Sequence, residues 1–300
     1  MIKWLSEQLF SQDLSVMNSI KRELRSPREI KKMRTSELVV WLAHQKAAQT
    51  LQPGVTTATV NDAYRNVFLE YSAEPLFLGY GARQGIEAFP AESCISVNEE
   101  VVHGIPGDRV IAEGDIVSVD TGCRIAGWCG DAAVTHAIGE ISKESQRLLE
   151  ITNGVLNLAI ELMGQKSLWS EVCKPMEQYV RDAGFFVVED MVGHGIGKEL
   201  HESPQVPNYY NESIMQAEDF ELKPGAVIAV EPMVNIGTQE LETLSDGWTV
   251  VTENRKNSAH FEHTIAITKT GPVRLTGPPN DEELTNLPDW VQDKSKWVIW

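Results

Sequence analysis

Two histidines lie seven positions apart (201 − 194) in residues 191–205, MVGHGIGKELHESPQ. Imidazole binds metals in its neutral form and exchanges protons near neutral pH, so either residue could do chemistry. A glycine on each side of His194 leaves no side chain to obstruct its ring, which favours a metal ligand over a core histidine bonded to backbone. His201, and His103 in the turn NEEVVHGIPG, are in isolation more typical of structural residues.

Four acidic residues interrupt runs that are otherwise apolar and of β type. They are Asp120 in IVSVDTG, Asp131 eleven positions on (131 − 120) in WCGDAAVTH, Glu231 at the end of AVIAVEP and Glu262 at the start of FEHTIAIT. A buried carboxylate is costly unless it is paired or bound to metal, and Arg124 is the only cation close in sequence. Each acid alone could instead sit exposed at a strand end. Four converging acids would raise each other's pKa, whereas two divalent cations would cancel their charge.

The acids together with His194 predict an oxygen-rich metal site with one imidazole. This donor set suits manganese, iron(II) or cobalt, with zinc as an alternative. Two metals that share a bridging carboxylate lie about 3.5–4 Å apart. The sequence therefore predicts a pair of divalent metal ions rather than one.

Helix and strand signals alternate along the chain and indicate which elements position these side chains. A capping box at 26–29 (Ser-Pro-Arg-Glu) begins a helix, and the Pro-Gly pair at 53–54 ends it. A second helix follows, and then short β-type runs over 76–136 are broken by glycine. Two more helices and more strands repeat this order, which predicts two related halves in one α+β domain.

Composition and charge narrow the class of protein. The chain of 300 residues is 42% hydrophobic, enough for one sizeable core, and its net charge of −17 argues against nucleic acid as a direct ligand. Basic residues crowd 21–34, where a solvated helical face competes with a docking patch. The four cysteines show neither paired nor zinc-ribbon spacing, which suggests a reducing compartment. Neither a signal peptide nor a membrane span is evident, so a cytoplasmic protein is expected.

Five motifs, in this order and spacing, resemble those of type I methionine aminopeptidases. They are SVNEEVVHGIPG, VSVDTG with Asp131 eleven positions on, GHGIGKELHESP, EPMV and FEHTIAIT. The resemblance covers residues 27–274. The interval between His201 and Glu231 lacks the insertion of type II enzymes, and DGWTVVTENRKNSAHFEHT is more like type I than like the proline-specific peptidases that share the fold.

The resemblance implies the pita-bread (creatinase/aminopeptidase) fold, with two pseudo-symmetric αβ halves around a central curved antiparallel sheet. It implies a ligand set with these roles: Asp120 on one metal, Asp131 and Glu262 as bridges, and His194 and Glu231 on the other metal. The implied reaction removes an N-terminal methionine when the second residue is small. Water activated by the cations attacks the peptide carbonyl, and Glu231 accepts its proton as general base.

The same resemblance places further residues around the substrate. His103 and His201 would lie beside the scissile bond, with His201 donating a hydrogen bond to the substrate carbonyl. The candidates for the methionine pocket, for which core packing is the alternative, are Phe77, Tyr80, Phe89, Cys94, Leu200 and Trp248. The loop 81–90 looks longer than is usual in the family, and Leu200 stands where relatives often carry an aromatic residue.

The resemblance also divides the chain. An N-terminal extension (1–26), which reads as an amphipathic helix, precedes the catalytic domain (27–274), and a tail with three tryptophans (275–300) follows. No ligand or pocket candidate lies in either extension, so both are expected to be dispensable for chemistry. Trp297 and Trp300 are nevertheless expected to dock on the domain, because exposed paired aromatics are unusual.

The implied partners are nascent polypeptides and peptides with an N-terminal methionine, and the ribosome is a further candidate. No direct nucleic-acid site and no membrane partner are expected, and the chain is expected to be a monomer. Two alternatives remain. A proline-specific aminopeptidase usually carries a large extra N-terminal domain, for which 1–26 is too short. A non-catalytic binding protein on this fold would have lost ligands, but all five ligand positions are filled.

Overall fold

The computed structural model describes residues 23–82 and 85–300. Most of the amphipathic helix expected within 1–26, with Lys21 and Arg22 of the basic run, lies outside the described residues. The described α-helices are α3 (Pro27–Ala48), α4 (Thr57–Glu70), α5 (Lys143–Met163), α6 (Ser170–Asp182), α7 (Glu212–Glu218), α8 (Asp281–Leu284) and α9 (Asp289–Gln292), and η1 (Lys294–Lys296) is a 3-10 helix.

The strands of the described chain pair only in antiparallel fashion and form four small sheets. In chain order they are β1 (Glu74–Pro75), β2 (Cys94–Val97), β3 (Glu100–Val102), β4 (Ile116–Ile125), β5 (Trp128–Ala137), β6 (Phe186–Val187), β7 (Gly193–Gly195), β8 (Glu202–Val206), β9 (Val227–Val230), β10 (Met233–Asn235), β11 (Leu241–Thr243), β12 (Val250–Thr252), β13 (Ser258–His260), β14 (His263–Thr268) and β15 (Gly271–Arg274).

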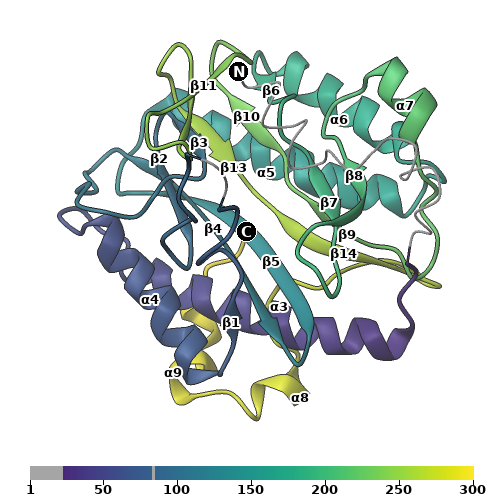
Figure 1. Ribbon diagram of the computed structural model, residues 1–300, viewed down its shortest axis with the longest axis horizontal. Helices are drawn as coiled ribbons and strands as arrows, with labels where there is room; N and C mark the ends of the chain where they lie inside the picture. Colours follow the sequence, from purple (N-terminus) through teal and green to yellow (C-terminus); the bar gives the residue numbers. More distant parts are fainter. Residues whose placement is uncertain (1–22, 83–84) are drawn as a thin grey trace.

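Two helix pairs flank the sheets, as the repeated order of elements predicts. α3 packs against α4 and across β4 and β5, whereas α5 packs against α6 and across β10, β13, β14 and β15. Figure 1 shows α3 and α4 in the lower part of the view and α5 and α6 in the upper part, with β5 and β14 running between them. Each pair buries apolar side chains against the sheets, among them Trp41, Leu42, Leu148 and Leu156. The two-halved pita-bread architecture is confirmed.

The predicted start of α3 is confirmed, whereas the helix ends at Ala48, before the Pro-Gly pair at 53–54. The Ser26 hydroxyl accepts a hydrogen bond from the Glu29 amide, and the Glu29 carboxylate accepts one from the Ser26 amide, which completes the capping box of α3. Gly184, at φ 85°, follows the last turn of α6. The apolar run FFVVEDM that follows α6 is typical of a longer strand, but only the two residues of β6 form one.

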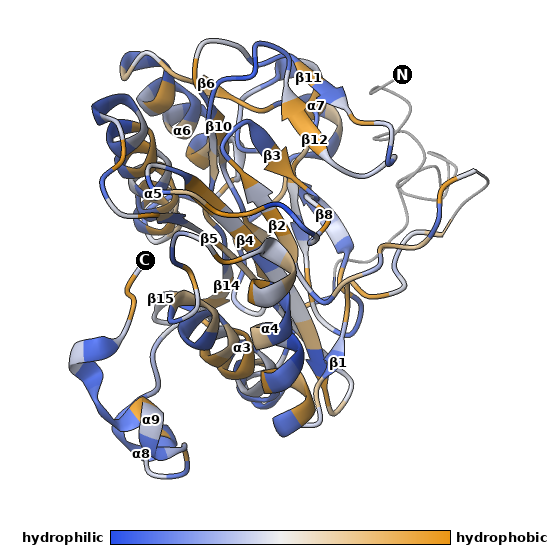
Figure 2. Cartoon of the chain, turned by 90° about the vertical axis from the view of Figure 1, so that its left-hand side faces the viewer, coloured by the Kyte–Doolittle hydropathy of each residue, from blue (hydrophilic) through white to orange (hydrophobic). Residues whose placement is uncertain are grey.

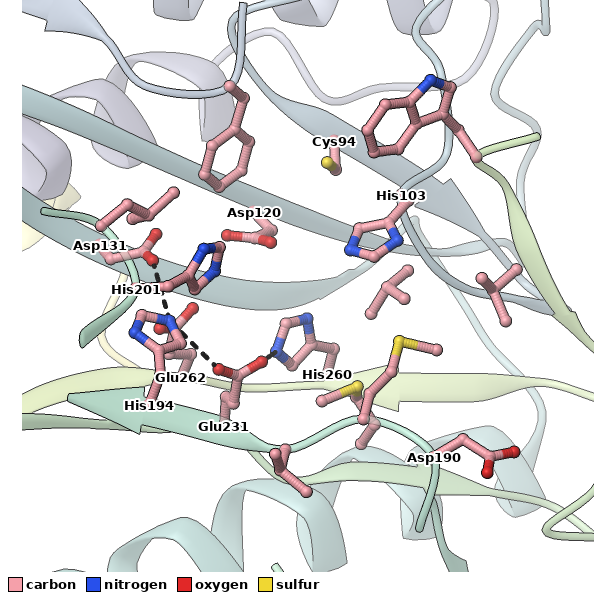
Figure 3. Close-up of a pocket in the computed structure, with 18 of the residues that line it drawn as sticks. Cys94, His103, Asp120, Asp131, Asp190, His194, His201, Glu231, His260 and Glu262 are labelled. Atoms are coloured by element: carbon pink, nitrogen blue, oxygen red, sulfur yellow. Dashed lines mark ion pairs between the residues drawn. The ribbon is translucent and has the colours of Figure 1, made fainter. Parts of the chain in front are cut away.

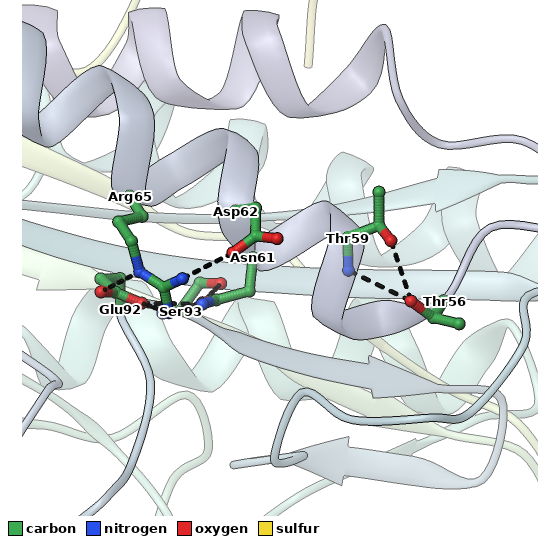
Figure 4. Close-up of polar contacts among 7 residues, drawn as sticks. All are labelled: Thr56, Thr59, Asn61, Asp62, Arg65, Glu92 and Ser93. Atoms are coloured by element: carbon green, nitrogen blue, oxygen red, sulfur yellow. Dashed lines mark hydrogen bonds and ion pairs between the residues drawn. The ribbon is translucent and has the colours of Figure 1, made fainter.

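Polar side chains of α4 hold the segment that leads into β2 (Figure 4). Asn61 Oδ1 accepts from the amide and from the hydroxyl of Ser93, at 3.0 and 2.8 Å. Arg65 Nε donates to one oxygen of Glu92 at 2.8 Å, and Asn61 Nδ2 donates to the other at 2.7 Å. These contacts fix the start of the strand that carries Cys94.

The hairpin of β4 and β5 brings two of the four acids together. Its turn has two residues, Ala126 at φ 50° and Gly127 at φ 78°, and this left-handed backbone matches the twist of the flanking strands. The register sets Asp131 opposite Gly122, two residues from Asp120. Because side chains alternate along a strand, both carboxylates leave the same face of the hairpin.

The other two acids meet at an interruption between two strand pairs. β9 pairs with β14, and β10 pairs with β13, in one continuous register in which paired residue numbers sum to 493. Glu231 and Glu262 fall opposite each other in the gap between these ladders. Pro232 has no N–H to donate there, although its carbonyl accepts from the Phe261 amide at 3.4 Å. The interruption therefore turns the two glutamates toward one site.

The C-terminal segment returns to α3. Trp297 packs edge-on against Trp41 with ring centroids 5.2 Å apart, and Gln45 exchanges two hydrogen bonds with the backbone of Val298, at 2.8 and 2.7 Å. Trp300 is only 7% exposed and packs between the rings of His44 and His263. The expected docking of the tryptophans is confirmed. Figure 2 shows that α8, which leads into this segment, is predominantly hydrophilic.

Replacing Trp300 with alanine should lower the free energy of unfolding by about 3 kcal/mol, because the change empties a buried aromatic site. Activity per folded molecule should persist, because the indole lies outside the cavity. Urea unfolding measures the loss, and Ile299→Ala is the matched control, since Ile299 is 65% exposed. Equal stability of the two variants would contradict the packing argument.

No helix of the described chain is long and apolar enough to cross a membrane. The four cysteines are all buried and free of disulfides. The basic run is not a uniform solvated face: Arg28, Lys31 and Lys32 are exposed, whereas Arg25 is buried and Arg34 donates to Glu283 and to three backbone carbonyls.

Candidate active site

A cavity of about 480 Å³ lies between the two halves, and every ligand, catalytic and pocket candidate from the sequence lines it. These residues are Phe77, Tyr80, Phe89, Cys94, His103, Asp120, Asp131, His194, Leu200, His201, Glu231, Trp248 and Glu262. Figure 3 shows Asp120 and His103 on one wall, facing Glu231, His260 and Glu262 on the other. No lysine or arginine is among the described residues that line the cavity, so the acids have no cationic side chain as a partner there.

Three of the predicted ligands form a compact cluster. Asp131, His194 and Glu262 are buried, and each offers a ligand atom within 4.8 Å of the other two. Oδ2 of Asp131 lies 3.6 Å from Nε2 of His194, and Oε1 of Glu231 lies 3.5 Å from the same nitrogen. The Glu262 amide donates to the Ala133 carbonyl at 2.9 Å, which ties β14 to β5 beside Asp131. Asp120 lines the same cavity outside this triplet.

Burial and mutual repulsion disfavour the charged forms of the acids in the cluster. Burial raises the pKa of Asp120 to about 8. For Asp131 and Glu262, burial is the largest cause and repulsion by the neighbouring carboxylates the next, and together they raise the pKa of each acid well above the ordinary range. Burial and then Asp120 do the same to the pKa of Glu231. One buried oxygen each of Asp120, Asp131 and Glu262 lacks a hydrogen-bond partner. Orphaned carboxylate oxygens beside a neutral imidazole are the donor set that divalent metals take.

His194 presents the correct nitrogen for metal binding. Its Nδ1 donates to the Gly195 carbonyl at 2.9 Å, which leaves the Nε2 lone pair facing the acids. Burial lowers the pKa of His194 to about 4, so the ring is neutral. The flanking glycines are required for a further reason besides the expected clearance of the ring. A Cβ on Gly193 would lie 2.3 Å from the Ala229 carbonyl oxygen, and one on Gly195 2.4 Å from that of Ser203, so close backbone approach requires both glycines.

His201 lies beside this cluster at the cavity mouth. Its ring centroid is 4.4 Å from that of His194, and its Nδ1 is 2.8 Å from the Tyr80 hydroxyl. Desolvation by the surrounding protein, and then His194, lower the pKa of His201 although the residue is exposed to solvent at the cavity mouth, so the neutral ring is favoured here as well. If the tyrosine donates to Nδ1, the proton of the neutral ring is on Nε2 and is available to a ligand.

An apolar recess adjoins the acids. Phe89 and His103 each meet the Trp248 ring edge-on, with ring centroids 5.4 and 6.2 Å from that of Trp248. Cys94 is buried near Asp120, and burial, followed in size by the effect of Asp120, raises the pKa of the Cys94 thiol. Backbone hydrogen bonds close the base of the loop that looked unusually long: Phe89 N donates to Tyr80 O at 2.9 Å, and Phe89 O accepts from Gly79 N at 2.8 Å. The loop therefore keeps both rings at the cavity.

Two buried residues near the site were not singled out from the sequence. His260 lines the cavity with its Nε2 3.8 Å from Glu231; it precedes Glu262 by two positions, so the alternation of a strand could have found it. Glu37 lies behind Asp131 on α3, accepts from the Thr276 hydroxyl at 2.6 Å, and burial raises its pKa to about 7. Glu37 could have been found from the sequence, because it lies at helical spacing from the core residues Met33 and Val40 and is therefore expected to be buried.

A second arm of the cavity was also missed. Its lining includes Met191, Met233, Glu189 and Asp190, and Figure 3 shows Asp190 away from the cluster of acids. These residues follow the short β6 or begin β10, where sequence patterns predict only strand and loop. The cavity therefore extends beyond the acids and the apolar recess.

A pita-bread fold that closes on acids and imidazoles without a compensating basic side chain defines a metal-dependent hydrolase of the aminopeptidase class. Comparison with known proteins is specific. The model of metallopeptidase family M24 matches residues 31–269. The chain belongs to metallopeptidase family M24, and its site is accordingly one for divalent metal.

Relatives within this family are close. Methionine aminopeptidase 1 of Bacillus subtilis is 41% identical over 247 residues, 82% of this chain and 96% of that protein. The methionine aminopeptidase of Aquifex aeolicus is 42% identical over 257 residues, 85% of this chain and 98% of that protein. The crystal structure of the methionine aminopeptidase from Thermotoga maritima superposes with a TM-score of 0.79 at 38% identity, covering 85% of this chain and 99% of that one.

Proposed function

We propose that this chain is a methionyl aminopeptidase, which hydrolyses the peptide bond after an N-terminal methionine when the second residue is small. The observation that carries the proposal is one cavity in which buried, uncompensated acids adjoin an apolar recess. The close relatives named methionine aminopeptidase favour it over a proline-specific peptidase. The Xaa-Pro dipeptidase of Bacillus anthracis shares only the fold, at 21% identity.

The proposed ligands are the five residues inferred from the motifs. Asp120 would hold one divalent ion, Asp131 and Glu262 would bridge, and His194 with Glu231 would hold the other; manganese, iron(II) or cobalt fits this donor set, and zinc is an alternative. Bound ions would polarise the scissile carbonyl and lower the pKa of water. The distances of 3.5 and 3.6 Å from His194 to the carboxylates support this arrangement.

The remaining side chains orient the substrate and move protons. Glu231, at the gap between two ladders, takes the proton of the attacking water as general base. His201 donates to the carbonyl oxygen as charge develops on it, and His103 contacts the substrate from the opposite wall. The recess of Phe77, Tyr80, Phe89, Cys94, Leu200 and Trp248 takes the methionine side chain, whose thioether packs well against aromatic rings.

The proposed setting follows from the substrate. Nascent chains carry the N-terminal methionine, so we place the enzyme in the cytoplasm, as a monomer that works near the ribosome without a nucleic-acid site of its own. The catalytic unit would span 27–274, with an extension over 1–26 and a tail over 275–300.

The test compares three tripeptides with the metal-loaded protein. Free methionine should be released from Met-Ala-Ser, and much more slowly from Met-Lys-Ser, because steric exclusion at the second residue discriminates against bulky side chains. Ala-Pro-Ser should not be cleaved. A chelator should abolish release, and added divalent metal should restore it. Equal rates on the two methionine peptides, or preference for Ala-Pro-Ser, would contradict the proposal.

A further inference from the structure

Arg25, just before α3, is buried although it belongs to the extension for which the sequence assigns no function. It is 5% exposed, and its backbone amide donates to the Gly225 carbonyl at 2.7 Å. Its guanidinium donates to Glu23 and Glu202 and lies 5.4 Å from the centroid of the Trp128 ring. A buried charge persists only where its partners are specifically placed, so this arginine fixes the groups around it.

Glu202 connects Arg25 to the turn at 197–201, which immediately precedes Glu202. One carboxylate oxygen of Glu202 accepts from the amides of Lys198 and Glu199, at 2.9 and 3.2 Å, while the other accepts from Arg25. The turn is also tied to β5, because the Cys129 amide donates to the Gly197 carbonyl at 2.8 Å. The single carboxylate therefore fastens both the turn and the arginine.

The guanidinium also fills the space beside the turn. A Cβ on Gly197 would lie 2.2 Å from Nη2 of Arg25, so the glycine lets the arginine approach the backbone. Leu200 and His201 follow directly on this turn and line the cavity. His201 is held on its other side by the Tyr80 hydroxyl. Arg25 and Tyr80 thus restrain the histidine from opposite ends, one through the backbone and one through the ring.

We infer that Arg25 is a positioning residue for His201, acting through Glu202 and the turn at 197–201. The inference rests on the proposed function for its kinetic consequence. Arg25 touches no substrate. Its effect is to hold the His201 ring where it donates to the developing charge, and a displacement of about 1 Å at such a group can cost about 100-fold in rate.

Steady-state kinetics on Met-Ala-Ser provide the first test. Arg25→Ala should lower kcat by about 10-fold to 100-fold with a much smaller change in KM, because the donor acts mainly in the transition state. Metal content should remain that of the wild type, since no ligand contacts Arg25. Arg25→Lys keeps the charge but not the forked geometry and should recover part of the loss. Arg28→Ala, an exposed arginine of the same segment, is the matched control.

Hydrogen–deuterium exchange of the metal-free protein gives a readout that does not depend on activity. The peptide covering 197–202 should exchange faster in Arg25→Ala than in wild type, whereas peptides of α5 and α6 should not change. Glu202→Gln keeps an acceptor for the turn amides but loses the ion pair. Its effect on kcat should not add to that of Arg25→Ala in the double variant, because one contact is removed twice.

The outcomes separate this inference from the proposed function. A wild-type protein that releases no methionine sinks the proposed function, and exchange of the 197–202 peptide still decides whether Arg25 braces the turn. A wild-type protein that is active, with unchanged kcat and unchanged exchange in Arg25→Ala, overturns the brace alone. If Arg25→Ala does not fold, Arg25→Lys and Glu202→Gln carry the same comparison.

Discussion

Glu262→Ala is expected to abolish methionine release and to leave the protein with fewer bound metal ions. Glu262 is 2% exposed and lies within the compact cluster with Asp131 and His194. As the proposed bridge it would serve both ions, so its removal weakens both positions at once. Losing an outer partner of a metal ligand already costs about 10–100-fold in metal affinity, and losing the bridging ligand itself should cost more.

Metal content and turnover must be measured on the same sample. The variant is loaded with excess manganese or cobalt, desalted, and analysed by elemental analysis alongside steady-state kinetics. Glu253→Ala, a change at an exposed acid nine positions earlier (262 − 253), is the matched control and should behave as wild type. A folded Glu262→Ala protein with full turnover and two bound metals per chain would remove the basis for the whole ligand assignment.

The acids could be found in the sequence because they interrupt apolar runs, in which an uncompensated carboxylate is unexpected. Asp120, Asp131 and Glu262 interrupt apolar strands, and a carboxylate is rarely buried without compensation. The spacing of Asp120 and Asp131 is also consistent with their geometry, since a hairpin with a two-residue turn places both side chains on one face. The resemblance to a family implied which role each of these residues has at the metal site, and spacing alone could not predict those roles.

Other features depend on contacts between distant segments, and no local pattern reports them. Arg25 meets Glu202 across 177 positions (202 − 25), and Glu231 lies opposite Glu262 only because two strand pairs share one register. A second role of Gly193 could not be predicted for the same reason. Its sequence neighbour is His194, but the atom that forbids a side chain is the Ala229 carbonyl oxygen of another strand.

His194→Ala and His201→Ala should fail in different ways although their rings are 4.4 Å apart. His194 turns Nε2 toward the carboxylates and fixes its tautomer through Gly195, so its loss should lower metal affinity. His201 bonds Tyr80 through Nδ1 and points its other nitrogen away from that hydroxyl. Its loss should leave both metals and the fold in place while turnover falls by about 10²–10³, or ~2.7–4 kcal/mol, as for a lost donor to a developing oxyanion.

Metal titration and steady-state kinetics on the two single variants decide between these roles. In His201→Ala the change in KM should be smaller than the change in kcat, because the donor bonds the transition state more strongly than the bound substrate. Tyr80→Phe removes only the hydroxyl that holds His201, and it should produce a smaller loss of kcat with metal affinity unchanged. Should His201→Ala strip the metals while His194→Ala retains them, the two imidazoles have the opposite roles, and the metal site must be rebuilt around His201.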